Sequence, residues 1–433
     1  MSTEKRKAFI WAGVILAAAV AFFLWISHGN PSDKPVEATM GRDPALGEPE
    51  TETFPSVGLA GTLGWEKGQA PVPAKGLAVN RFAEGLDHPR TLLTLPNGDV
   101  LVTETNAPAD AGPGGVTGFF QNLFMKIVGA GDASPNRIVL LRDGNGDGTA
   151  EQRFTFREED LDSPSGMAWT SDKLFVANHN AVLVWDFVPG GTALKGEPKL
   201  LMELPAAGNH WMRNLLLSKD NKKLYVAVGS ASNIAERGTL IEEGRAAIWE
   251  IDLTGGTRRQ YAAGLRNPNG MAWNPSSGEL WTVVNERDML GPDLVPDYLT
   301  NVPVGAQYGW PWVYWKDIQD WRVREPMPAY ITEYTRKPEF ALGAHTAPLG
   351  LLFGEGGHVL GADFANGAFI ARHGSWNRKP LVGYDVIFVP FDANGNPQDR
   401  HVTLLSGFLD ADGKDAHGRP VWLAWDKGGA LLV

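Results

Sequence analysis

The sequence contains no cysteine in 433 residues. This absence excludes disulfide bonds, thiolate metal sites and cysteine nucleophiles, and it leaves the redox compartment open. Positive charge is also scarce, because 39 lysines and arginines stand against 50 acidic residues, a formal net charge of −11. Nucleic-acid binding requires a basic face, so no nucleic-acid partner is expected. None of the nine histidines lies in a paired metal-ligand motif of the H-E-x-x-H kind.

The residues that are abundant indicate a globular chain rich in turns. The sequence has 51 glycines, 30 prolines and 16 tryptophans, and 43% of its residues are hydrophobic. This composition favours an aromatic-rich interior between short strands over a helical bundle. The length would suit two or three average domains, but repeated all-β architectures form long single domains.

The N-terminal region predicts a membrane anchor. Lys5-Arg6-Lys7 precede an uncharged apolar run from Ala8 to Ile26, near the ~20 residues that a membrane-spanning helix needs. A cleaved signal peptide would have a shorter apolar core and small residues at its end, whereas this run ends in bulky residues. We therefore expect residues 1–27 to form a cytoplasmic stub and a single inner-membrane helix, with the remaining chain in the periplasm. Residues 28–75 are rich in proline and glutamate, and they predict an extended, poorly ordered linker.

From residue 76 the sequence repeats a unit of short strands and turns. In the first unit Asn97-Gly98 separates two apolar runs, Thr91–Leu95 and Val100–Glu104, which is a strong hairpin signal. Five further units begin near Gly166, Asn214, Gly270, Leu349 and Pro420. One such unit cannot bury both faces of its sheet, and radial repetition solves this problem in β-propellers. We predict an all-β, six-bladed β-propeller over residues 76–433, with residues 76–82 completing the last blade.

Two long insertions interrupt this repeat. The first runs from Ala107 to Pro135 and contains an amphipathic stretch, Phe119–Val128. That stretch predicts a lid, a membrane-facing helix or a helix packed over a blade edge. The second insertion runs from Met289 to Ala344.

Polar residues with catalytic potential stand at the loops between blades. His210 precedes the strand Leu215–Leu217, where it is either a general base or a loop histidine bonded to backbone. Arg266-Asn267 suits an anionic or acceptor-rich ligand, or else an internal salt bridge. Asn285–Asp288 offers oxygen donors for Ca²⁺, or forms an ordinary polar turn.

Further cations occupy equivalent loops. Arg378 or Lys379, and Arg419, stand in later units, and loops of this kind converge on one mouth in a propeller. Together with His210 and Arg266 they predict an anion-binding pocket on an acidic protein. The Asp143–Gly148 stretch begins like an EF-hand loop, but Phe154 stands where the loop needs a bidentate glutamate, so a hairpin turn is expected.

Several of these motifs resemble the glucose/sorbosone dehydrogenases, quinoproteins that use pyrroloquinoline quinone (PQQ). The matching stretches are Leu265–Ala272, Gln307–Pro311, the His210 loop and Gly418–Val421. Asn285–Asp288 and Gly374–Arg378 are similar to the membrane-associated L-sorbosone dehydrogenase branch.

The resemblance implies roles for the site residues. His210 would be the general base that takes the proton from the C1 hydroxyl of the sugar, while hydride passes to C5 of the quinone. Arg266 would polarise a quinone oxygen, with Asn267 beside it. Ca²⁺ would chelate PQQ and be held by backbone carbonyls near Arg287 and Asp288. Arg378 or Lys379, and Arg419, would pair with the PQQ carboxylates.

The sequence therefore predicts a PQQ- and Ca²⁺-dependent dehydrogenase of a sugar aldehyde or aldose, passing electrons to a cytochrome or a membrane quinone. Two alternatives stay open. A Ca²⁺-dependent lactonase would need several carboxylate and amide ligands converging in the channel, and a non-catalytic propeller would bind a partner without any cofactor.

Overall fold

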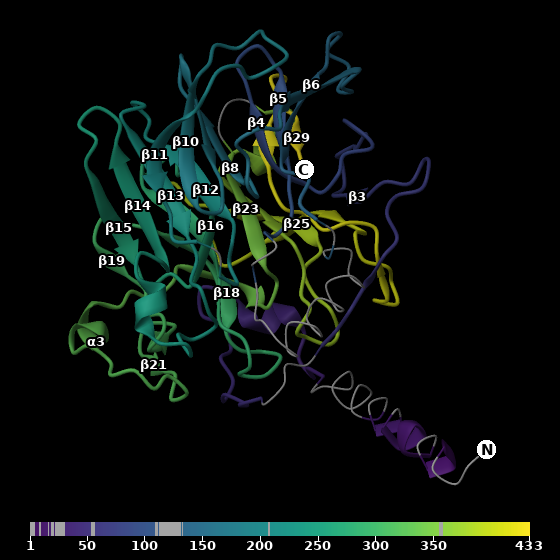
Figure 1. Ribbon diagram of the computed structural model, residues 1–433, viewed down its shortest axis with the longest axis vertical. Helices are drawn as coiled ribbons and strands as arrows, with labels where there is room; N and C mark the ends of the chain where they lie inside the picture. The colour runs from purple at the N-terminus through teal and green to yellow at the C-terminus, as the bar shows by residue number, and fades with distance from the viewer. Residues whose placement is uncertain are drawn as a thin grey trace.

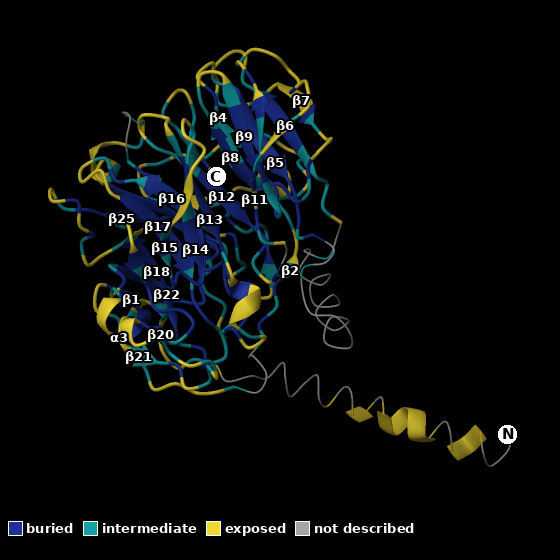
Figure 2. Cartoon of the chain, turned by 60° about the vertical axis from the view of Figure 1, so that its left-hand side comes forward, coloured by how far each residue is buried: buried dark blue, intermediate teal, exposed yellow. Residues whose placement is uncertain are grey.

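The computed structural model describes residues 5–7, 10–15, 17–18, 21, 31–52, 57–108, 111, 131, 133–206, 208–354 and 358–433. Antiparallel sheets dominate these residues and are arranged around a common axis as a β-propeller (Figure 1). The buried residues lie along the sheets, and the exposed ones follow the turns (Figure 2). The prediction of an all-β propeller is confirmed.

Each blade is a sheet of four consecutive or nearly consecutive strands. Blade one contains β4 (Pro89–Thr94), β5 (Val100–Glu104), β6 (Arg137–Arg142) and β7 (Gln152–Arg157). Blade two contains β8 (Gly166–Trp169), β9 (Lys173–Ala177), β10 (Ala181–Asp186) and β11 (Lys199–Glu203). Blade three contains β12 (Arg213–Leu217), β13 (Lys223–Val228), β14 (Ala247–Asp252) and β15 (Arg258–Ala263). Blade four contains β16 (Asn267–Trp273), β17 (Leu280–Asn285), β18 (Pro296–Asn301) and β22 (Phe340–Ala344). Blade five contains β23 (Pro348–Phe353), β24 (Gly367–Arg372), β25 (Asp385–Pro390) and β26 (Val402–Ser406).

The innermost strands of successive blades pack side by side around the axis. Ser165 hydrogen-bonds across this contact, because its Oγ donates to the Arg213 carbonyl at 2.9 Å and accepts from the Arg213 amide at 2.8 Å. Asn214 Nδ2 donates in turn to Asn269 Oδ1 at 3.4 Å. These buried bonds hold the starts of the inner strands together, and the predicted site residues lie at those starts.

The described residues form five blades, so the prediction of six blades is wrong. The sixth predicted unit forms only two two-residue strands, β28 (Ala424–Trp425) and β29 (Leu431–Leu432). This hairpin lies between blades five and one: β28 contacts β4, and Trp425 Nε1 donates to the Phe353 carbonyl at 3.1 Å (Figure 1). Residues 76–82 form no strand beside it, because the segment just before them, β3 (Val72–Pro73), pairs with the outer strand β26 instead.

The predicted poorly ordered linker is packed against the propeller over its described residues. After a 3₁₀ turn, η1 (Val36–Thr39), the strand β1 (Met40–Gly41) extends blade four by pairing with β22. A second strand, β2 (Gly61–Thr62), pairs with β27 (Asp415–Ala416). β1 extends the edge of a blade and β2 forms a separate two-stranded sheet with β27, so the segment gains order without any periodic pattern of its own.

The predicted transmembrane span and the amphipathic stretch 119–128 fall largely or wholly outside the described residues. Within the described part of the chain, no helix has both the length and the apolar character needed to span a bilayer.

The second predicted insertion contains two strands of blade four itself, β18 and β22. Between them lie β19 (Ala306–Gln307), β20 (Val313–Tyr314), β21 (Ile318–Gln319) and the short helix α3 (Tyr330–Tyr334). β19 pairs in parallel with β15 of blade three, so this segment connects two blades. Two further 3₁₀ turns are η2 (Thr239–Glu242) and η3 (Ala362–Phe364).

Candidate active site

His210 lies just before β12 and is held in one tautomer. Its Nδ1 is 2.9 Å from the Ser230 carbonyl and 3.0 Å from Ser230 Oγ. A carbonyl oxygen only accepts, so Nδ1 carries the proton and Nε2 keeps its lone pair. Burial, followed by the positive charge of Arg266, lowers the pKa of His210 well below its usual value. The ring is therefore a neutral imidazole with an available base at Nε2.

Gly229 brings His210 next to Asn267. A Cβ at Gly229 would lie 2.6 Å from the His210 Cβ and would also overlap the Asn267 side-chain oxygen. Ser230 links the loops before blades three and four. Its amide donates to the Arg266 carbonyl at 2.8 Å, and its own carbonyl accepts from His210. The structure thus brings together His210, Arg266 and Asn267, three of the predicted site residues.

Arg266 is buried, with every guanidinium nitrogen engaged by the protein. Nε donates to the Asn233 carbonyl at 3.1 Å, and Nη2 donates to Asn233 Oδ1 and to Asp288 Oδ2, both at 2.9 Å. Nη1 donates to the Glu286 carbonyl at 2.5 Å and more weakly to the Asn285 carbonyl at 3.4 Å. The guanidinium is therefore a fixed positive charge beside His210. The sequence left open whether Arg266 binds a ligand or forms an internal salt bridge. The structure shows the salt bridge, which Arg266 makes with Asp288.

Asp288 gathers residues that sequence reasoning missed. Its Oδ1 accepts from Asn377 Nδ2 at 2.7 Å, and its Oδ2 accepts from Arg266. The same Asn377 amide lies 3.1 Å from Nδ1 of the buried His345. Asn233 reaches the cluster from the loop between β13 and β14. Asn377 lies in the loop Gly374–Arg378, whose basic and aromatic residues were the one sequence signal for it. Asn233 and His345 lie in stretches without a sequence pattern that indicates a site.

The turn at Arg287 and Asp288 does not fit a divalent cation. The Arg287 side chain is fully buried and points into the blade-four insertion, where Nη1 donates to the Pro311 carbonyl at 2.6 Å and Nη2 to the Val313 carbonyl at 2.8 Å. The Glu286 and Asp288 carbonyls accept from Arg266 and, at 2.9 Å, from Arg322. Positively charged donors thus occupy oxygens that a Ca²⁺ ion would need. The predicted metal role of Arg287 and Asp288 stays a prediction, and no step below depends on it.

Arg378 and Lys379 hold the N-terminal segment. The Arg378 side chain is 1% exposed and pairs with Asp293 Oδ1 at 2.9 Å. Its Nη2 also donates to Ser32 Oγ at 2.9 Å and to the Lys34 carbonyl at 2.8 Å. The Lys379 carbonyl accepts from the Ser32 amide at 2.7 Å. These contacts give Arg378 a structural role and leave its guanidinium committed to the protein.

Arg419 differs from Arg378 in its contacts. Its guanidinium carbon lies 4.8 Å from the centroid of the Tyr384 ring, and among the described residues Nη2 is buried without a hydrogen-bond partner. Burial lowers the pKa of Arg419. Burial also lowers the pKa of His373 well below the usual value, and the positive charge of Arg419 lowers it further. A buried guanidinium with an unused donor is suited to hold an anionic ligand.

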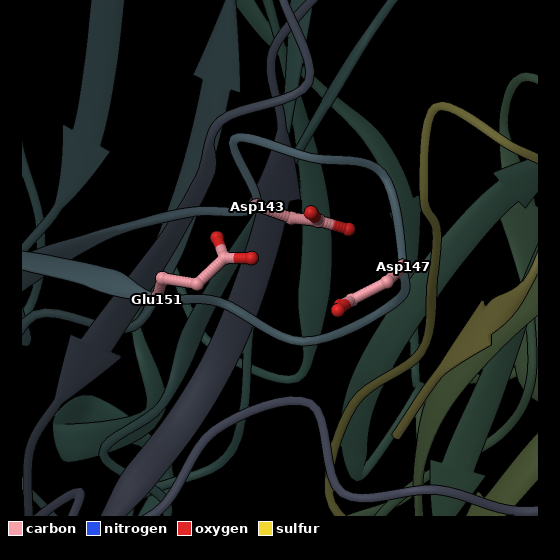
Figure 3. Close-up of side chains that lie close together, drawn as sticks. All are labelled: Asp143, Asp147 and Glu151. Atoms are coloured by element: carbon pink, nitrogen blue, oxygen red, sulfur yellow. The ribbon is translucent and has the colours of Figure 1, made fainter.

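A cluster of three carboxylates lies on the turn between β6 and β7. Figure 3 shows Asp143, Asp147 and Glu151 around this turn, and they form the one described group of three side chains able to hold a metal ion. Asp143 already caps the turn, accepting from the Gly146 amide at 2.6 Å and the Gly148 amide at 2.9 Å. The predicted hairpin turn is confirmed. Elsewhere in the described chain, no other three histidine, aspartate or glutamate side chains lie close enough together to share a metal ion.

Comparison with known proteins points to one family. The family model described as TrAA12-like matches residues 132–301 and 328–433. A curated "uncharacterized protein" of Borreliella burgdorferi is 27% identical over 319 residues, covering 69% of this chain and 82% of that protein. A PQQ-dependent pyranose dehydrogenase of Coprinopsis cinerea is 32% identical over 140 residues, covering 27% of this chain and 18% of that protein.

Solved structures share the fold. A Trichoderma reesei enzyme of carbohydrate-active family AA12 superposes with a TM-score of 0.66 at 21% identity, covering 84% of this chain and 94% of that one. The PQQ domain of the Coprinopsis cinerea pyranose dehydrogenase in its holo form gives 0.64 at 20% identity, covering 86% and 99%. The family resemblance drawn from the sequence motifs is confirmed.

Proposed function

Since the chain belongs to the TrAA12-like family of PQQ sugar dehydrogenase relatives, we propose that it is a quinoprotein that oxidises a sugar at its C1 position. The observation that carries this proposal is the neutral His210, held with its Nε2 lone pair available beside the fixed charge of Arg266. The family and the oxidoreductase class follow from the relatives. The substrate, the mechanism and the acceptor are our proposals.

The residues at the mouth fit PQQ. PQQ carries three carboxylates, and when bound it accepts the hydride that leaves C1 of the sugar. The buried Arg419 Nη2 has no acceptor among the described residues, which suits a carboxylate. The Tyr384 ring lies against the guanidinium of Arg419 and helps to position it. Lys379 is half-buried on the loop that carries Asn377, and we retain it as a secondary candidate for a carboxylate contact.

His210 acts as the general base in this proposal. Its Nε2 takes the proton of the C1 hydroxyl, while Nδ1 keeps its own proton and donates it to the Ser230 carbonyl, which stabilises the imidazolium that forms. Because Arg266 and burial disfavour that imidazolium, His210 returns its proton readily. The product would be a lactone from an aldose, or an acid from a hydrated sugar aldehyde.

Arg266 and Asn267 supply electrostatics and position. Arg266 has no idle donor, so we assign it a stabilising charge for negative charge that develops nearby. Its weakest contact, 3.4 Å to the Asn285 carbonyl, is the donor that a ligand oxygen would capture at least cost. Asn267 Nδ2 likewise makes only a 3.4 Å contact, to Asn285 Oδ1, and we propose that it binds the cofactor.

The cellular setting rests on the sequence. We propose that the apolar run Ala8–Ile26 anchors the chain in the inner membrane and that the propeller works in the periplasm. Electrons would pass from the reduced cofactor to a cytochrome or a membrane quinone.

Reconstitution tests the proposal. The purified protein is incubated with PQQ, with and without Ca²⁺, and dye reduction is followed with pyranoses and with sugar aldehydes. We expect sugar-dependent dye reduction that requires PQQ. Lactone hydrolysis without PQQ would instead establish the lactonase, and the absence of both activities together with retention of a protein partner would establish a binding module.

A further inference from the structure

Arg90 is a second half-buried arginine with a buried nitrogen that the described protein leaves without a partner. It stands at the start of β4, the inner strand of blade one, and its guanidinium carbon lies 4.9 Å from the centroid of the Trp211 ring. Among the described residues its Nε is buried without a hydrogen-bond partner and no carboxylate forms an ion pair with it. Trp211 directly follows His210, so Arg90 reaches the catalytic loop from the opposite blade.

The positive charges of Arg90 and Arg419 both act on His373. After burial, the positive charges of Arg419 and then Arg90 lower the pKa of His373. Both arginines therefore lie close enough to His373 to act on its ring, although they come from blade one and from the segment after blade five. The lowered pKa favours the neutral ring, which adds no third positive charge.

Several buried arginines elsewhere in this protein are paired with carboxylates, although Arg213 donates to backbone carbonyls instead. Arg266 pairs with Asp288, Arg287 with Glu286, and Arg378 with Asp293. An isolated buried cation is costly, and burial lowers the pKa of Arg90 to about 10. Arg90 and Arg419 each keep a nitrogen without a hydrogen-bond partner among the described residues. An anion with more than one carboxylate would supply acceptors to both.

We propose that Arg90 and Arg419 together bind the carboxylates of the cofactor. This inference rests on the proposed function, because it assigns Arg90 to the same ligand. Arg90 then links the cofactor to Trp211 and so fixes its position relative to His210. Arg90 is a binding residue in this account and moves no proton.

The test measures PQQ binding, not turnover. Equilibrium dialysis of PQQ is compared for the wild-type chain, Arg90→Gln and Arg400→Gln, a control at an exposed arginine whose one described side-chain bond is to Gln398. Loss of one charge-assisted contact should weaken PQQ binding by roughly 10- to 100-fold in Arg90→Gln, with Arg400→Gln unchanged. Arg90→Lys keeps the charge and loses the planar fork, so its affinity should lie between the two.

Thermal unfolding without PQQ separates ligand binding from a structural role. Removing an unpaired buried cation should leave the midpoint of Arg90→Gln unchanged or raise it. A lower midpoint together with wild-type PQQ affinity would overturn the assignment.

Two further outcomes are decisive. If the wild-type chain binds no PQQ, the proposed function fails and takes this inference with it. If the wild-type chain binds PQQ and Arg90→Gln binds it equally well, this inference alone fails. Inorganic phosphate that displaces PQQ from the wild type but not from Arg90→Gln would support a carboxylate-binding role for Arg90.

Discussion

Two groups of arginines in this propeller differ in what they are bonded to. Arg266 and Arg378 each have an acidic partner at 2.9 Å and several carbonyl acceptors. Arg90 and Arg419 lie over aromatic rings, and within the described chain each keeps a buried nitrogen without an acceptor. The first group holds the protein together, and the second is prepared for a ligand that the chain does not supply.

The comparison separates stability from binding. A paired arginine cannot be removed without leaving a buried acid uncompensated, whereas an unpaired one can. Substitutions in the first group should therefore change unfolding, and substitutions in the second should change ligand affinity. Residue type does not distinguish the two groups; their partners do, and so does burial, because Arg266 and Arg378 are buried while Arg90 and Arg419 are only half-buried.

The largest effect is expected at the proposed base, His210. His210→Ala should lower turnover by roughly 10²- to 10⁴-fold, because it removes the acceptor for the hydroxyl proton. PQQ affinity should stay close to wild type, since the proposed carboxylate contacts lie elsewhere. Steady-state dye reduction and PQQ dialysis measure the two quantities, with His401→Ala as a matched control on the outer part of blade five. Normal turnover would remove His210 from the mechanism.

The paired group is tested at Arg378. Arg378→Gln should lower the free energy of unfolding by about 3–5 kcal/mol, because Asp293 loses its partner in a mostly buried position. Urea unfolding gives this number, and PQQ affinity of the folded variant should be unchanged. If Arg378→Gln instead lost PQQ binding at full stability, the two groups would have been assigned the wrong way round.

The unpaired group is tested at Arg419. Arg419→Gln should weaken PQQ binding by about 10-fold or more, with no loss of stability in the absence of PQQ. Dialysis and thermal unfolding are run on the same preparation. A destabilised variant with normal affinity would place Arg419 with the structural arginines.

The smallest effect concerns pH. The folded-state pKa of His210 is lowered, first by burial and then by Arg266, so the neutral base persists below pH 6.5. We expect kcat/KM to stay level as pH falls to 6.5 and to decline only at lower pH, as His210 takes up a proton. A profile from pH 5 to pH 8 measures this. An acid limb at or above pH 6.5 would show that Arg266 does not act on the base.

Much of this organisation could be predicted from the sequence. Alternating strands with Asn-Gly turns predicted the propeller, and the starts of inner strands predicted that His210, Arg266 and Asn267 meet. The blade count failed because the last unit supplies only β28 and β29, and two apolar stretches in a sequence do not reveal how many strands will pair.

The partners of the charged residues could not be predicted. Arg378 and Arg419 both follow glycine-rich strand ends, yet one meets Asp293 and Ser32 and the other meets Tyr384. Those partners come from segments without periodicity, including the N-terminal stretch expected to be a linker. Arg90 was missed for the same reason, because it looks like an ordinary first residue of a strand until Trp211 and His373 pack beside it.

The central claim is that the mouth binds PQQ through the unpaired arginines and presents the sugar to His210. The most direct measurement is an absorbance titration of the purified protein with PQQ, followed by addition of a pyranose. We predict saturation at one PQQ per chain and loss of the oxidised quinone band on adding sugar, with His210→Ala binding PQQ but keeping that band. A wild-type chain that shows no saturable PQQ binding would contradict the account.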